Sequence, residues 1–341
     1  MGVAAVRRAA LRRSRDARRA ALRGRSEPGA PGRDDLGTGT GGQSHGGQPS
    51  HRGGSHACRS HPRGRTGGSR MTSTWKDIVG RYIEVDGTPT YYDEIGVGGR
   101  PIICVHTAGA NALEYRYLLP LLAEAGFHAI ALDLPGRART YAWRGEVTTT
   151  IHRHAEFVRL FKRELFGESK VVVTGTSIGG DVTIDLAVSY PEDFSAAIAF
   201  EGAARTPTFP DPGEYMQPSW NPGWQDTMER ISGAALNAKC PPEKEEELRW
   251  MHRNAQVSAV GDLQGWANHD VRDQLSNATI PVLVAAGVED FWLPEELVDE
   301  TVAGLPDAEK LMIDGIGHYP MFEAPELICS IIVDFVERKV N

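Results

Sequence analysis

One stretch decides the fold of this chain: KVVVTGTSIGG, at residues 170–180. It begins with a short apolar run, Lys170–Thr174, which is typical of a buried parallel strand. The run leads into the pattern G-x-S-x-G, and helical apolar spacing follows over Ile178–Tyr190. This order of strand, glycine-flanked serine and helix predicts a tight turn that lifts the hydroxyl of Ser177 clear of a sheet edge. Glycines suit the turn because a Cβ there would collide with the strand and the helix.

The segments on either side of this stretch alternate between the same two patterns. Apolar runs predict further strands at Pro101–His106, His128–Leu132, Ser195–Phe200, Pro281–Ala286 and Ala308–Ile313. Helical spacing covers Ala112–Ala125, Thr148–Phe166, Pro294–Gly304 and Pro325–Lys339. A hairpin is predicted from Arg81–Val85 and Pro89–Glu94, which Asp86 and Gly87 join. The alternation predicts an α/β fold: a mostly parallel sheet of about eight strands, covered by helices on both faces.

Residues 203–275, called the insertion below, interrupt this alternation. Four of the seven tryptophans lie in it: Trp220, Trp224, Trp250 and Trp266. A connection of this length is usually a lid or a binding element, so we expect a lid. The aromatic residues either form a core of the insertion itself or, for Trp220 and Trp224 in loop sequence rich in Pro and Gly, line a substrate pocket.

The first 70 residues differ in composition from the rest of the 341-residue chain. Fifteen arginines and four acids give them a net charge of +11, which leaves −19 on the remainder of a chain whose total is −8. They contain no Phe, Trp, Tyr or Ile. Such a segment cannot bury enough apolar surface to offset its ordering entropy, so we expect a disordered Arg/Gly-rich tail over 1–70 and a folded domain over 71–341.

Three interpretations of the tail are open. It lacks the apolar segment of a secretory signal, which leaves an Arg-rich organellar transit peptide, a nucleic-acid-binding arm, or upstream sequence before a natural start at Met71. We expect the last, because the pattern of a complete domain follows Met71 directly. The histidines over 45–61 predict no more than adventitious metal binding.

Charge and cysteine usage exclude several classes of function for residues 71–341. An acidic domain repels phosphate backbones, which argues against a nucleic-acid ligand. No apolar run of about 18 residues exists, so no membrane span is expected. The four cysteines show no CxxC spacing, which predicts neither a zinc site nor a disulfide framework. We therefore expect a cytoplasmic protein with a small-molecule substrate; the sequence leaves monomer and homo-oligomer open.

A serine nucleophile needs a base, and the base needs an orienting acid. In the chain order Ser, Asp, His, the residues that follow predicted strands are Asp290, 113 residues after Ser177, and His318, a further 28 residues on. All three stand at the carboxyl ends of parallel strands, where sites form in open α/β sheets. The order predicts Ser177 as nucleophile, His318 as base and Asp290 as acid.

Other acids compete with Asp290. Glu289 is its neighbour, whereas Glu201 and Asp133 also end predicted strands, and Glu201 is the best substitute. The tetrahedral oxyanion needs two backbone donors: one is the amide of Ile178, and the other belongs to the loop His106–Gly109.

From about Arg81 onward the chain resembles the α/β-hydrolase fold family, in its lid-bearing serine esterase, lactonase and carbon–carbon hydrolase branch. The matching pieces are VHTAG (105–109), DLPGRART (133–140), GTSIGG (175–180), GVEDFWLP (287–294) and GIGHYPMFEAPE (315–326). The resemblance implies a cofactor-free serine mechanism through an acyl-enzyme, a helical lid, and Ala108 as the second oxyanion donor. Two positions depart from the family pattern: Thr107 and Ala138 stand where the family has glycine.

The sequence therefore predicts hydrolysis of a carboxylic ester or lactone by Ser177, His318 and Asp290, with no cofactor and no metal. Carbon–carbon hydrolysis of a diketone ring-fission product by the same residues is an alternative, as is a ligand-binding relative without turnover. Expected substrate contacts are His106, Thr107, Trp220, Trp224, Trp292 and Tyr319.

Overall fold

A computed structural model describes residues 74–206, 223–237, 239–255 and 258–340. The predicted tail thus lies outside the described residues. The described part opens with an antiparallel hairpin of β1 (Val79–Val85) and β2 (Thr88–Ile95). At its turn, Asp86 and Gly87 have φ of 47° and 75°, the backbone that a two-residue hairpin turn requires. The predicted hairpin is confirmed.

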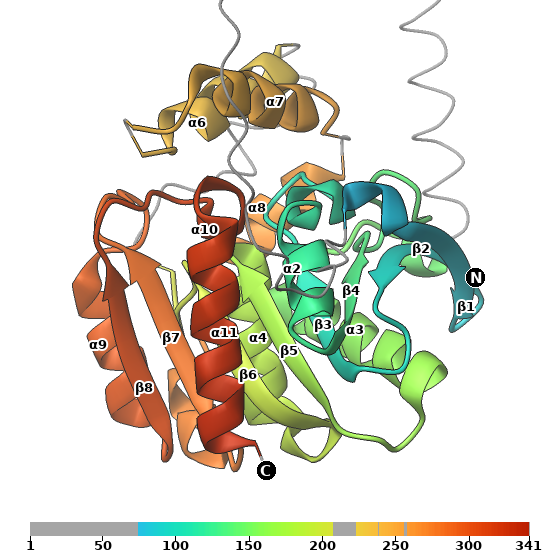
Figure 1. Ribbon diagram of the computed structural model, residues 1–341, viewed down its shortest axis with the longest axis vertical. Coiled ribbons are helices and arrows are strands. Elements are labelled where there is room, and N and C mark those ends of the chain that lie inside the picture. The colour runs from blue at the N-terminus through green and yellow to red at the C-terminus, as the bar shows by residue number, and fades with distance from the viewer. Residues whose placement is uncertain (1–73, 207–222, 238, 256–257, 341) are drawn as a thin grey trace, which may run out of the picture. The chain divides into compact units, whose positions relative to one another are not determined.

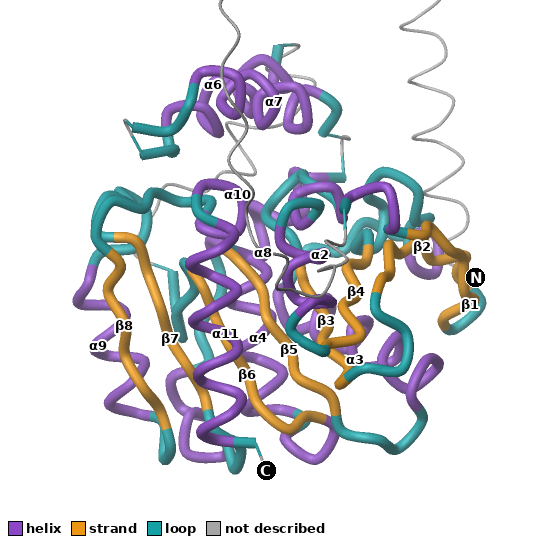
Figure 2. The backbone as a smooth tube through the Cα atoms, viewed as in Figure 1, coloured by secondary structure: helices purple, strands orange, loops and turns teal. Residues whose placement is uncertain are grey.

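An eight-stranded sheet, in the order β1-β2-β4-β3-β5-β6-β7-β8, organises the described residues (Figures 1 and 2). The other strands are β3 (Arg100–Val105), β4 (Phe127–Leu132), β5 (Val171–Thr176), β6 (Phe194–Phe200), β7 (Val282–Gly287) and β8 (Ala308–Ile313). All pairs from β4 to β8 are parallel, whereas β2 pairs antiparallel with β4. The predicted α/β fold is confirmed.

Helices cover both faces of this sheet. One layer consists of α3 (Ile151–Phe166), α4 (Ile178–Ser189) and α9 (Glu295–Gly304), and the other of α2 (Leu118–Glu124), α10 (Pro320–Glu323) and α11 (Pro325–Lys339). Figure 1 shows α2 and α11 in front of the sheet and α3 and α4 behind it. Side chains of β3 alternate between the layers, because Ile103 packs with the first and Ile102 with the second.

Two predicted helices differ from those observed. The expected helix Ala112–Ala125 is divided into a 3₁₀ turn, Ala112–Tyr115, and α2. Pro120 lacks the N–H that a continuous helix would need there, so α2 begins just before it. The helix expected from Thr148 begins at Ile151, because the Thr150 side chain accepts the N–H of Arg153 and caps it. Further 3₁₀ turns are Trp75–Asp77, Trp143–Gly145 and Pro191–Asp193.

The insertion contains α6 (Trp224–Ala234), α7 (Pro242–Arg253) and α8 (Ala259–Ala267), and the 3₁₀ turn Arg272–Asn277 spans its end. Figure 1 shows α6 packed along α7. The structure separates its tryptophans: Trp266 packs against the sheet's core, whereas Trp250 is 62 % exposed. Trp220 lies outside the described residues, and so does the side chain of Trp224. In the described part of the chain, every helix is too short or too polar to cross a membrane.

Candidate active site

Ser177 occupies a strained turn between β5 and α4. Its φ of 59° and ψ of −123° are rare for a residue with a Cβ. Two backbone hydrogen bonds hold it there: the N–H of Ser177 donates to the carbonyl of Phe200 at 3.0 Å, and the N–H of Asp181 donates to the carbonyl of Ser177 at 2.9 Å. Ser177 is 9 % exposed. The predicted turn is therefore present, with the serine at the carboxyl end of a central strand.

The glycines of this turn are required by close backbone contacts. A Cβ on Gly175 would lie 2.1 Å from the carbonyl oxygen of Gly179, and one on Gly179 would lie 2.1 Å from that of Val105. A Cβ on Gly180 would lie 2.5 Å from the carbonyl oxygen of Phe200. The collisions expected from the motif are confirmed, and the start of α4 is pressed against the end of β3.

His318 and Asp290 form a buried acid–base pair beyond β7 and β8. Nδ1 of His318 donates to Oδ2 of Asp290 at 2.7 Å, and the N–H of Trp292 donates to Oδ1 of Asp290 at 2.8 Å. Burial acts to raise the pKa of Asp290, but the charge and hydrogen bond of His318 outweigh it and bring the pKa down to about 2. Asp290 is thus ionised at neutral pH, and it directs Nε2 of His318 away from itself.

Glu201 lies beside this pair, at the end of β6. Its Oε1 accepts the N–H of Gly287 at 2.7 Å. One potential metal-ligand atom each from Glu201, Asp290 and His318 lies within 4.8 Å of the others. Burial, and then the charge of Asp290, raise the pKa of Glu201 well above its usual range. A protonated Glu201 can donate to Asp290. Among the described residues this is the one group of three side chains able to ligate a metal, but His318 and Asp290 already use facing atoms on each other.

The other competing acids have different partners. Glu289 accepts a hydrogen bond from the side chain of Asn237, and Asp133 accepts the Nε of Arg139 at 2.8 Å and the N–H of Ala112 at 2.9 Å. The carboxylate hydrogen-bonded to His318 is that of Asp290.

The two expected oxyanion donors lie at adjacent points of the sheet edge. Ile178 is the first residue of α4, and Ala108 belongs to the turn that follows β3, residues 106–110, called the β3 turn below. Neither the Ile178 N–H nor the Ala108 N–H makes a hydrogen bond to any residue that the structure describes. Both amides are therefore available to an anionic oxygen.

The remaining expected contacts divide into two groups. Trp292 and Tyr319 flank His318, with ring centroids 4.5 and 5.3 Å from its imidazole. His106 is fully buried: its Nδ1 donates to the Thr107 carbonyl at 2.7 Å, and its Nε2 accepts the N–H of Leu134 at 3.0 Å. Burial lowers the pKa of His106, which fits this neutral ring. Substrate contact stays a prediction for all of these residues.

Four buried residues near the β3 turn were assigned no role from the sequence: Glu114, Arg137, His252 and Asp262. One signal was available. Asp262 is the single charged residue of α8, whose sequence is AVGDLQGWA. A charge within an otherwise uncharged helix indicates a buried partner.

Known proteins resemble this chain in both sequence and fold. A family model described as alpha/beta hydrolase fold matches residues 100–258. A 2-hydroxy-6-oxo-6-(2'-aminophenyl)hexa-2,4-dienoic acid hydrolase of Metapseudomonas resinovorans is 24 % identical over 77 % of this chain and 92 % of its own length. A pimeloyl-[acyl-carrier protein] methyl ester esterase of Vibrio atlanticus is 22 % identical over 73 % of this chain and 99 % of its own.

Solved structures agree with this assignment. A thermophilic esterase from Thermogutta terrifontis has a TM-score of 0.67 and 21 % identity, covering 76 % of this chain and 98 % of its own. An enol-lactonase from Burkholderia xenovorans has a TM-score of 0.66 and 18 % identity, covering 75 % and 100 %. The chain therefore has the α/β-hydrolase fold, and its residues 100–258 match the model of that family.

Proposed function

We propose that this protein is a serine hydrolase that cleaves a carboxylic ester or lactone through an acyl-enzyme. The observation that carries the proposal is the buried hydrogen bond between His318 and an ionised Asp290, at the sheet edge where Ser177 is held in its strained turn. The family relatives named as an esterase and a lactonase support the same class of reaction.

In the proposed mechanism, the Ser177 hydroxyl attacks the substrate carbonyl while Nε2 of His318 accepts its proton. Asp290 stays ionised and stabilises the imidazolium through Nδ1. The alcohol leaves with the proton from His318, and a water activated by His318 then cleaves the Ser177 ester. Glu201 lies beside Asp290 and contributes, in this proposal, as a protonated neighbour rather than as the acid of the triad.

Negative charge on the substrate oxygen is stabilised in this proposal by the amides of Ala108 and Ile178. Both N–H groups lack partners among the described residues, so a developing oxyanion would not have to displace an existing bond. The N-terminus of α4 adds the positive end of its helix dipole. Such groups act because they are oriented before the reaction begins.

The substrate is proposed to be a small molecule that contacts Trp292 and Tyr319 beside His318. We also propose that the protein acts in the cytoplasm and that the insertion serves as a lid. Trp220 and Trp224 of the insertion are proposed to contact the substrate. Carbon–carbon hydrolysis is the second candidate, because the Metapseudomonas relative carries the name of a hydrolase of that substrate type.

Labelling by a fluorophosphonate probe tests the nucleophile. We expect wild-type protein to be labelled at Ser177 and Ser177→Ala to be unlabelled, with ester hydrolysis reduced by at least ~10³-fold in that variant, since the triad acts as a unit. Ser330→Ala, at an exposed serine of α11, is the matched control. Near-wild-type activity in Ser177→Ala would contradict the mechanism. A screen of esters, lactones and ring-fission diketones distinguishes the two reactions.

A further inference from the structure

The β3 turn is bound by a carboxylate on each side of Ala108. The N–H and the hydroxyl of Thr107 donate to the two oxygens of Glu114, at 2.9 and 2.7 Å. The N–H of Gly109 donates to Oδ2 of Asp262 at 3.0 Å. The N–H of Ala108 lies between these two bound amides and has no partner within the described residues. The N–H groups of Thr107 and Gly109 are thus hydrogen-bonded, whereas the N–H of Ala108 between them has no partner within the described residues.

Both carboxylates connect the turn to the insertion. Asp262 belongs to α8, and Glu114 accepts Nε2 of His252, from α7, at 3.1 Å. Glu114 and His252 are 0 % and 1 % exposed. Burial acts to raise the pKa of Glu114, but the hydrogen bond and charge of His252 outweigh it and leave the pKa below its usual value. Glu114 is therefore available as an acceptor for Thr107.

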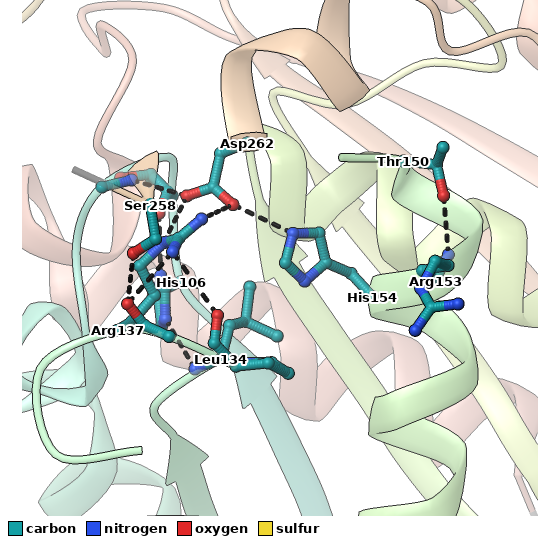
Figure 3. A network of polar contacts seen from close by, with 12 residues as sticks. His106, Leu134, Arg137, Thr150, Arg153, His154, Ser258 and Asp262 are labelled. Carbon is teal, nitrogen blue, oxygen red and sulfur yellow. Dashed lines mark hydrogen bonds and ion pairs between the residues drawn. The ribbon is translucent and has the colours of Figure 1, made fainter. Parts of the chain in front are cut away.

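Asp262 is the centre of a buried polar network, which Figure 3 shows from close by. The Nε of Arg137 donates to it at 2.7 Å, a second guanidinium nitrogen of Arg137 also contacts it, and Nε2 of His154 donates at 2.9 Å. Burial opposes ionisation, but the Arg137 charge dominates and holds the pKa of Asp262 well below its usual range. An ionised acceptor binds the N–H of Gly109 more strongly than a neutral one.

Packing holds the turn against the insertion as well. Gly109 has a φ of 71°, and a Cβ on it would lie 3.1 Å from the Cβ of Ala255, 3.2 Å from that of Ala259 and 3.2 Å from the Cε of Met228. These three residues belong to one small apolar cluster of the insertion. The insertion therefore packs directly over Gly109 and leaves no space there for a side chain.

We propose that Asp262 and Glu114 are positioning residues that orient the Ala108 N–H toward the substrate oxyanion, so that the insertion helps to build the oxyanion hole. This inference rests on the proposed function. Thr107 is part of the arrangement, because its hydroxyl makes a bond to Glu114 that the glycine of the family pattern could not make. Fixing the neighbouring amides leaves Ala108 one orientation, which is the condition for electrostatic stabilisation of a transition state.

The variant Asp262→Asn removes the charge and keeps the shape. Because losing one oxyanion donor costs about 10²–10³ in kcat, a misdirected donor should cost ~10–100-fold, with KM changed by less than ~3-fold. The Ki of a trifluoromethyl ketone, whose adduct carries the oxyanion, should rise by the same factor. The Ki of the matching methyl ketone should not change.

Asp193→Asn is the matched control. Asp193 is also a buried acid, and its side chain is bound by Arg159, Lys162 and Arg163 of α3 rather than by the β3 turn. We expect its kcat to stay within ~3-fold of wild type, since it is outside the proton path. Equal kcat losses in Asp193→Asn and Asp262→Asn would overturn the proposal.

Thr107→Val keeps the inference testable if Asp262→Asn does not fold, because it keeps the shape of the side chain and replaces only a hydroxyl by a methyl group. It should lower kcat by ~3–10-fold with KM unchanged, and a wild-type kcat would contradict the role of Glu114. Hydrogen exchange separates this inference from the proposed function. Amide hydrogen exchange over residues 106–110 should accelerate in Asp262→Asn and in Thr107→Val, and this holds even if the wild-type protein is not labelled by a fluorophosphonate. Unchanged exchange would show that the two carboxylates do not hold the β3 turn, and would leave the proposed hydrolase function untouched.

Discussion

Replacing Asp290 by asparagine tests the acid of the proposed triad, and the contacts of Asp290 set the expected effect. Oδ1 accepts the N–H of Trp292, and Oδ2 accepts Nδ1–H of His318. An asparagine would keep its single oxygen toward the Trp292 N–H and present its NH₂ to His318. The imidazole would then carry its proton on Nε2 and could not accept one from Ser177.

The expected loss in kcat is ~10²–10⁴-fold, equivalent to about 2.7–5.4 kcal/mol of transition-state stabilisation. KM should change by less than ~3-fold, because Asp290 lies behind His318 and not against the substrate. Steady-state kinetics on the best ester from the screen measure both quantities.

Glu201 adds a pH signature to this variant. The charge of Asp290 is one cause of the raised pKa of Glu201, so its removal should let Glu201 ionise at a lower pH than in wild type. Activity of Asp290→Asn should then recover in part as pH rises. The double variant with Glu201→Gln should show no recovery.

Single substitutions of the neighbouring acids complete the test. Glu201→Gln and Glu289→Gln should each cost less than ~10-fold in kcat, as groups outside the proton path. A crippled Glu201→Gln together with an active Asp290→Asn would mean that the acid assignment is wrong, although Ser177 and His318 would stand.

Three further outcomes are expected. A chain that starts at Met71 should fold and keep kcat, because the described sheet begins at Val79; loss of soluble protein or activity would show that the tail is structural. Gly179→Ala should give no folded protein by circular dichroism, since its Cβ would lie 2.1 Å from the carbonyl oxygen of Val105. Burial raises the pKa of Asp181 from 3.8 to about 8. The buried Asp181 therefore costs no folding stability below pH 3.8, where it is protonated in both states, and it destabilises the folded protein increasingly as pH rises toward 8. Asp181→Asn should therefore raise Tm more at pH 8 than at pH 4, and an equal shift at both would refute this.

The strands were predictable because buried parallel strands have a simple local pattern. Runs such as Pro281–Ala286 lack alternation, and their ends carry turn residues that place them within a residue or two of β7 and its neighbours. Helix limits were less accurate where one residue overrides the periodicity. Pro120 shortens α2, and the Thr150 cap delays α3.

The candidate site also has a part that the sequence predicts and a part that it does not. Ser177, Asp290 and His318 each follow a strand, so topology alone brings them to one sheet edge. The contact of Gly109 with Asp262 joins residues 153 positions apart, through a helix whose docking no local pattern encodes. That contact therefore required the structure.

The ion pair between Arg137 and Asp262 limits how this enzyme can be re-engineered. Exchanging the insertion between relatives would assume that it is an independent module. Here a transplanted insertion without an acid at position 262 would leave the buried guanidinium of Arg137 without its ion-pair partner, at a cost of about 3–5 kcal/mol. A successful chimera would have to carry both partners, because contacting residues do not contribute additively. Arg137 and Asp262 would therefore have to be transferred together.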